Sequence, residues 1–276
     1  MLLKTFAAVG AAATALDLTV RGPKATALKT AGTALLRFAG YFFTAGIGYL
    51  AGMYAFTELT VDLDEPQEKP SAFWQRQFGD VAEMVRDASN VKVVLTGREK
   101  LPKDGRYLVV SNHRSLYDPV TMAATFRDDG YIYISKPSNF KIPIAGKLMH
   151  KCGCMALNRE NNREALVTIK RASELIKNGE ASVVIYPEGT RSKENELKPF
   201  HAGSFKIAQK SGAPVVLIAM RNTDKVQHNA PFKRTTVYID IVDVIDASFV
   251  KTHSTKETAE LAQKKIQERL DIENQK

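Results

Sequence analysis

Hydrophobic and polar positions along the chain follow two patterns, and the change between them comes near residue 58. Residues 1–57 are dominated by apolar and small side chains and hold only six charged positions. Beyond residue 70, short runs of β-branched and other apolar residues alternate with stretches of helical periodicity. A polar, proline-containing segment at 64–70 separates the two regions. The pattern therefore predicts an apolar N-terminal arm, a linker and a separate αβ body.

The body is expected to be an α/β or α+β domain with helices on the faces of its sheet, because its strands alternate with helices. Of these, we expect the α/β class, with a mixed β-sheet flanked by helices. The predicted strands span residues 91–96, 107–111, 131–135, 154–157, 182–186, 214–220 and 235–242. The predicted helices span residues 119–127, 162–178, 201–211 and 254–270. The domain boundaries that follow are 1–57 for the arm, 58–84 for the linker and a connecting helix, and 85–276 for the body.

The arm is long and apolar enough to meet a membrane. Residues 38–57 are twenty uncharged positions, which as a helix would reach about 30 Å, the thickness of the hydrocarbon core. Gly48 and Gly52 form a GxxxG pattern that permits close helix approach. A second, weaker apolar stretch covers residues 1–20 and ends at Gly22-Pro23. Two apolar helices joined by a basic turn at 21–29 could dip into one leaflet of the bilayer and return, as a monotopic anchor does.

Three other interpretations of the arm stay open. A buried hairpin of a soluble protein would have the same composition, although soluble core helices are usually shorter. A single span at 38–57 would, by the positive-inside rule, leave the body outside the cell. A cleaved signal peptide would use Ala13-Thr14-Ala15 as its cleavage site, but the segment before it carries a single lysine, Lys4.

Charge and composition narrow the class of partner. The chain has 276 residues and a formal net charge of +9, which points to an anionic partner such as a phosphorylated substrate, a membrane surface or nucleic acid. No nucleic-acid recognition motif appears, and an apolar arm has no use in that role. Its two cysteines exclude a disulfide scaffold, and the cluster at 150–154 has no second ligand pair for a metal site.

Candidate chemistry begins after the predicted strand 107–111. His113 follows that strand, and Asp118 with Pro119 is typical of a helix N-cap and first turn. A spacing of five does not place His113 and Asp118 on one helix face. We therefore expect a loop that folds back, so that the carboxylate accepts from one imidazole nitrogen and leaves the other as a base. A plain helix cap beside a polar strand-end residue is the structural alternative.

A second polar group follows the predicted strand 182–186. It supplies a carboxylate, a flexible backbone, a hydroxyl and a guanidinium at Glu188, Gly189, Thr190 and Arg191. Arginine suits bidentate contact with phosphate, and a glycine amide can approach an oxyanion closely. A surface turn with a capped arginine is the alternative.

These residues carry a family resemblance. The sequences NHRSLYD at 112–118 and YPEGTRS at 186–192 resemble the first (HX4D) and third motifs of the glycerolipid acyltransferase family, and of the 1-acylglycerol-3-phosphate acyltransferases in particular. Residues 136–159 resemble the second motif and 213–218 the fourth, where Leu217 replaces a common proline. The resemblance covers residues 85–225.

The resemblance implies transfer of a fatty acyl group from a thioester to the sn-2 hydroxyl of lysophosphatidate, giving phosphatidate for phospholipid biosynthesis. His113 would be the general base and Asp118 its orienting partner, with no covalent acyl-enzyme. The substrate-binding residues would be Lys136, Arg159, Glu188, Gly189, Thr190 and Arg191.

The family also implies no cofactor and an acyl donor that is either acyl-coenzyme A or acyl-acyl carrier protein. Both donors are cytosolic, so we expect a cell-membrane protein with its body on the cytoplasmic side. Acylation of another lysophospholipid or of glycerol 3-phosphate is an alternative. So is a catalytically silent lipid-binding protein of the same fold.

Overall fold

The computed structural model describes residues 2–21, 27–65, 69–192 and 196–274 and contains two compact units. The first unit ends at Asp62 and the second begins at Leu63. The expected basic turn at 21–29 and the linker at 64–70 fall partly outside the described residues. The expected boundary of the arm was residue 57, whereas the second helix of this unit continues to Thr60.

The first unit is a hairpin of α1 (Leu2–Arg21) and α2 (Ala27–Thr60). Near its start, α1 packs Phe6 against Phe42 and Tyr49 of α2. Near its end, Asp17 forms an ion pair of 3.0 Å with Arg37. The start of α1 thus contacts a later part of α2, and the end of α1 contacts an earlier part, so the two helices run antiparallel. By length and composition, Leu2–Val20 and Gly32–Thr60 are each apolar enough to cross a membrane.

The second unit is built on a seven-stranded mixed sheet with the order β1-β7-β6-β2-β5-β3-β4. The strands are β1 (Val91–Thr96), β2 (Leu108–Ser111), β3 (Tyr131–Ser135), β4 (Met155–Ala156), β5 (Ser182–Ile185), β6 (Val215–Arg221) and β7 (Thr235–Ile245). Strands β4, β3, β5, β2 and β6 are parallel, and β7 is antiparallel to β6. This topology confirms the predicted mixed sheet.

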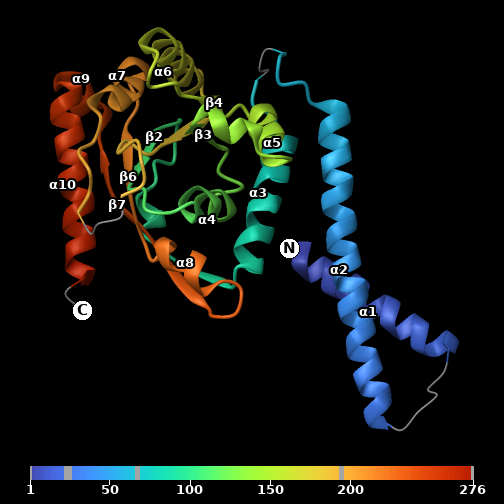
Figure 1. Ribbon diagram of the computed structural model, residues 1–276. Helices are drawn as coiled ribbons and strands as arrows, with labels where there is room; N and C mark the ends of the chain where they lie inside the picture. Colours follow the sequence, from blue (N-terminus) through green and yellow to red (C-terminus); the bar gives the residue numbers. More distant parts are fainter. Residues whose placement is uncertain (1, 22–26, 66–68, 193–195, 275–276) are drawn as a thin grey trace. The chain divides into compact units, whose positions relative to one another are not determined.

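Helices cover both faces of the sheet (Figure 1). One group is α3 (Ala72–Ala88), α4 (Tyr117–Thr125), α5 (Ala145–Lys151) and α8 (Thr223–Asn229). The other group is α6 (Asn162–Lys177), α7 (Lys206–Ser211), α9 (Ala247–Thr252) and α10 (Thr255–Asn274). Single 3-10 turns occur at η1 (Arg98–Lys100), η2 (Pro137–Lys141) and η3 (Ala202–Phe205).

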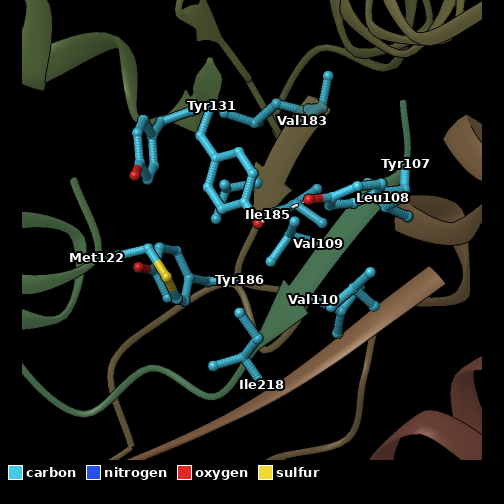
Figure 2. Close-up of a cluster of buried hydrophobic side chains, with 14 of the residues drawn as sticks. Tyr107, Leu108, Val109, Val110, Met122, Tyr131, Val183, Ile185, Tyr186 and Ile218 are labelled. Atoms are coloured by element: carbon cyan, nitrogen blue, oxygen red, sulfur yellow. Dashed lines mark hydrogen bonds between the residues drawn. The ribbon is translucent and has the colours of Figure 1, made fainter. Parts of the chain in front are cut away.

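The core lies around the central strand β2. Its residues Leu108–Ser111 are fully buried, since both edges are paired and both faces are covered. Figure 2 shows the side chains of β2 among those of its neighbours β5 and β6, such as Val183 and Ile218. Tyr107 and Tyr131 share a buried hydrogen bond of 3.1 Å between their hydroxyls. A strand buried on both faces accounts for the continuous apolar run that precedes the first polar motif.

Local chemistry explains where several elements begin and end. Asn161 caps α6, because its side-chain oxygen accepts from the backbone amides of Arg163 and Glu164. The predicted helix 201–211 is divided into η3 and α7, and α7 ends at Gly212 in the left-handed conformation. The short helices α5, α8 and α9 were not predicted, because six or seven residues are too few to establish a helical period.

Candidate active site

The predicted site residues lie where parallel strands end. His113 follows β2, Glu188 follows β5, Lys136 follows β3 and Arg159 follows β4. Because these four strands are parallel, their carboxyl ends form one edge of the sheet. Residues separated by up to 75 positions in sequence thus reach a common edge, where α/β proteins usually bind their ligands.

His113 and Asp118 contact each other directly. The Nδ1 atom of His113 lies 2.7 Å from Oδ2 of Asp118. The same oxygen accepts hydrogen bonds from the backbone amides of Arg114 (2.6 Å) and Ser115 (2.7 Å). Asp118 is fully buried in the first turn of α4. The loop therefore folds back onto the start of the helix, and the carboxylate is held by three donors.

The imidazole of His113 is oriented on a second side by Tyr186. The two rings stack with centroids 4.6 Å apart and an interplanar angle of 29°. Since the carboxylate accepts at Nδ1, the proton is assigned to that nitrogen, and Nε2 is left as the basic atom. The side chain of His113 is 21% exposed, so a substrate can reach it.

Glu188 is buried and binds backbone rather than facing the edge. Its Oε1 accepts from the backbone amide of His113 at 2.7 Å, and its Oε2 accepts from the amide of Lys198 at 3.1 Å. Burial raises the pKa of the Glu188 carboxyl, although these two hydrogen bonds oppose the rise. The carboxylate thus fixes the position of the His113 loop, a role that the sequence did not reveal.

Side chains of Arg159 and His201 lie beside Gly189. This glycine has a φ of +78°, and a Cβ there would collide with the guanidinium of Arg159. The same Cβ position lies 3.1 Å from Nε2 of His201. Among the described residues, no carboxylate pairs with Arg159. Burial lowers the pKa of this guanidinium, as expected for a cation that lacks an anion.

Thr190, Arg191 and Lys136 are exposed at the same edge. The ammonium group of Lys198 donates to Oγ1 of Thr190 at 3.0 Å and to the carbonyl of Arg191 at 3.2 Å. Lys136 precedes η2 and makes no hydrogen bond with another site residue in the described part of the chain. The structure therefore brings His113, Asp118, Glu188, Gly189 and Arg159 into one constellation and leaves Lys136 beside it.

Sequence reasoning missed two supporting residues. The Asn112 amide accepts from the backbone N–H of Met220 (2.8 Å) and donates to its carbonyl (2.9 Å), which ties the end of β2 to β6. His201 reaches Gly189 across the site. Asn112 stands inside the first motif and His201 beside the third, so closeness to a motif was the signal available for both.

Comparison with known proteins shows similarity over the region that holds the site. Residues 92–221 match the protein family described as Acyltransferase. The chain is 42% identical over 136 residues to the chloroplastic 1-acyl-sn-glycerol-3-phosphate acyltransferase BAT2 of Brassica napus, covering 49% of this chain and 39% of that protein. It thus spans about two fifths of the length of this relative.

Bacterial relatives align over more of their length. The chain is 29% identical over 182 residues to the 1-acyl-sn-glycerol-3-phosphate acyltransferase of Haemophilus influenzae, covering 63% of this chain and 75% of that protein. The crystal structure of the 1-acyl-sn-glycerophosphate acyltransferase PlsC from Thermotoga maritima superposes with a TM-score of 0.59 at 25% identity. That match covers 74% of this chain and 80% of the other.

Proposed function

We propose that this chain, whose residues 92–221 match the acyltransferase family, transfers a fatty acyl group from an acyl thioester to the sn-2 hydroxyl of 1-acyl-sn-glycerol 3-phosphate, giving phosphatidate. Similarity to proteins of that activity supports the reaction and the acceptor. The observation that carries the mechanism is the contact of 2.7 Å between His113 and the buried Asp118.

His113 acts as the general base. Its Nε2 removes the proton of the acceptor hydroxyl as the oxygen attacks the thioester carbonyl carbon. The tetrahedral intermediate then collapses, the carbon–sulfur bond breaks, and the thiolate takes the proton from the imidazolium. Asp118 stabilises the positive charge that His113 carries between these two steps. The acyl group passes directly to the acceptor, without a covalent enzyme intermediate.

The acceptor phosphate binds over Gly189. Arg159 supports this placement, because its guanidinium lies there without a carboxylate partner among the described residues. Arg191, Thr190 and Lys136 extend the polar edge, and a planar guanidinium suits two phosphate oxygens at once. Glu188 contributes indirectly, by fixing the backbone of His113.

The hairpin of α1 and α2 associates with a cell membrane, and the second unit faces the cytosol. Two apolar helices of sufficient length support membrane association. The cytosolic side follows from the acyl donor, which is a thioester of coenzyme A or of acyl carrier protein. An antiparallel hairpin fits this arrangement, because both of its ends stay on one side of the bilayer.

The test is acyl transfer to lysophosphatidate by the full chain in detergent, with both thioester donors supplied. We expect His113→Ala to lower kcat by about 10³-fold, because general base catalysis typically contributes 10²–10⁴-fold. His253→Ala is the matched control, since this histidine at the end of α9 stacks on Phe249, and its carbonyl accepts a hydrogen bond from Gln209 of α7, the helix before β6. Equal activity of His113→Ala and wild type would remove His113 from the mechanism. Lipid binding without any transfer would favour a silent lipid-binding protein.

Asp118→Asn tests the orienting role separately. The asparagine preserves the volume but removes the negative charge that holds Nδ1 protonated, so we expect kcat to fall by at least about 10²-fold with little change in KM. Circular dichroism of the variant should match that of the wild type. A variant with unchanged kcat would show that the carboxylate serves only as a helix cap.

A further inference from the structure

Exposed apolar side chains emerge beside the site from three separate loops. Leu116, in the loop after β2, is 62% exposed, and Ile142, after η2, is 49% exposed. Phe232, in the loop between α8 and β7, is 95% exposed. A single exposed apolar side chain is ordinary at a protein surface, and what these three share is their place at one edge of the sheet.

All three loops lie at the carboxyl edge of the parallel strands. Leu116 lies between β2 and α4, and Ile142 comes after η2, the turn that follows β3. The loop with Phe232 follows β6, which is parallel to β2, and leads into the antiparallel β7. Figure 1 shows α8 beyond the ends of β6 and β7. A contact of 3.9 Å between Arg114 and Asp224 joins the His113 loop to α8.

Basic residues surround these apolar positions. The segments 112–118, 136–144 and 222–234, which include η2 and α8, contain six lysines and arginines: Arg114, Lys136, Lys141, Lys225, Lys233 and Arg234. They contain two carboxylates, Asp224 and Asp118, and Asp118 is fully buried. Aromatic and aliphatic tips among lysines and arginines match a bilayer surface that carries anionic lipid.

We propose that this surface, termed the edge surface and defined by Leu116, Ile142 and Phe232 with the six basic residues, docks directly on an anionic lipid bilayer. Phe232 enters the interface between head groups and acyl chains, and Lys233 and Arg234 bind phosphate groups beside it. This contact is separate from the apolar hairpin. It rests on the proposed function only in its purpose, which is to let a lipid acceptor move from the bilayer to His113 without crossing water.

The experiment places a fluorescent label at position 232 of the full chain. Cys152 and Cys154 are buried, so Phe232→Cys supplies one accessible thiol for a bimane label, and unsubstituted protein gives the background. The control is Lys210→Cys, an exposed position on α7 before β6, at the opposite edge of the sheet. Both proteins are reconstituted in vesicles of phosphatidylcholine with or without about 30% phosphatidylglycerol, prepared with and without brominated acyl chains.

Brominated lipid should quench the label at 232 at least about twofold more than the label at 210. This excess should shrink when phosphatidylglycerol is omitted or when Lys233 and Arg234 are both replaced by glutamate. Equal quenching at the two positions would overturn the proposal. The proposal would also be overturned if a soluble acidic acyl carrier protein, and not the vesicles, covered the label at position 232. Because quenching needs no turnover, this result is independent of whether the acyltransferase assay succeeds.

Discussion

Gly189 shows how much one residue decides at this site. Its φ of +78° is readily adopted by glycine, and the space beside its Cα is filled by the guanidinium of Arg159. A side chain at this position would therefore meet both backbone strain and a displaced cation. The glycine of the third motif is thus required for two physical reasons, of which the sequence indicated only backbone flexibility.

Gly189→Ala separates these two effects when it is compared with Gly179→Ala. Both glycines have positive φ, +78° and +72°, but a Cβ at Gly179 meets nothing within 4 Å. Each variant should lose about 1 kcal/mol of unfolding free energy from left-handed strain. Gly189→Ala alone should raise KM for lysophosphatidate, by about tenfold, because Arg159 must move. Steady-state kinetics measures KM, and denaturant unfolding in detergent measures the unfolding free energy. Equal KM values for Gly189→Ala and Gly179→Ala would refute the role of Arg159.

At this scale the sequence predicted local contacts better than distant ones. The spacing of His113 and Asp118 predicted a folded-back loop, because both residues belong to one local turn. The role of Glu188 was not predictable, since its carboxylate binds the amide of a residue 75 positions earlier. Such a contact depends on β2 and β5 being neighbours, which neither motif reveals.

Among the secondary-structure elements, strands were predicted more completely than helices. All seven strands appear in the structure at predicted positions, because buried β-branched runs bounded by polar residues are a strong signal. The order of the strands in the sheet was not predictable, since β2, β5 and β6 are all strongly apolar runs and their sequences do not show which strands are neighbours. The order places β2 between two later strands, and this placement forms the site.

Asp240 joins four elements of the second unit. Its buried carboxylate on β7 accepts from Thr96 of β1, from Arg221 of β6 at 3.1 Å and from Arg269 of α10 at 3.3 Å. Burial by itself would raise the pKa of Asp240, but these hydrogen bonds outweigh it and hold the pKa below the ordinary value of 3.8. The ionised carboxylate is therefore favoured by the fold.

Asp240→Asn should lower the unfolding free energy by about 1–3 kcal/mol near neutral pH, because two arginines lose a buried partner. Since the pKa of Asp240 is lowered in the folded state, the wild type has the larger unfolding free energy above pH 3.8. This difference should disappear as the pH falls below 3.8 through the folded-state value.

Asp243→Asn is the matched control for Asp240→Asn. It lies on the same strand and pairs with Lys265 of the same helix, but its side chain is 44% exposed. Asp243→Asn should lower the unfolding free energy by less than about 1 kcal/mol. Urea unfolding at a series of pH values measures both variants. A difference between wild type and Asp240→Asn that grows on acidification would contradict the account of this cluster.

At the scale of the whole molecule, the proposed membrane association of the hairpin would place both of its ends on one side of the bilayer. α1 and α2 are antiparallel, as the contacts of Phe6 with Tyr49 and of Asp17 with Arg37 require. Hydropathy alone left a single span and a two-helix hairpin both open. The packing of α1 on α2, which hydropathy does not encode, supports the hairpin.

A hairpin predicts that the start of α1 and the second unit are reached from the same side. Lys4→Cys and Lys170→Cys each supply an exposed thiol, on α1 and on α6. In sealed inverted membrane vesicles, both should react with a membrane-impermeant maleimide without detergent. Reaction of position 170 alone would indicate a single span with its two ends on opposite sides. Protection of position 170 would contradict the cytosolic placement.

The central position of β2 also affects the order of events during translation. β2 is complete at Ser111, but its two partners begin only at Ser182 and Val215. The ribosome must therefore add roughly a hundred residues after β2 before the strand is paired on both edges, and pairing over such separations is slow. The apolar hairpin emerges long before then. If the hairpin associates with a membrane as proposed, the nascent chain is held at the bilayer while His113 still lacks Glu188, and delivery to the membrane precedes the assembly of the proposed catalytic site.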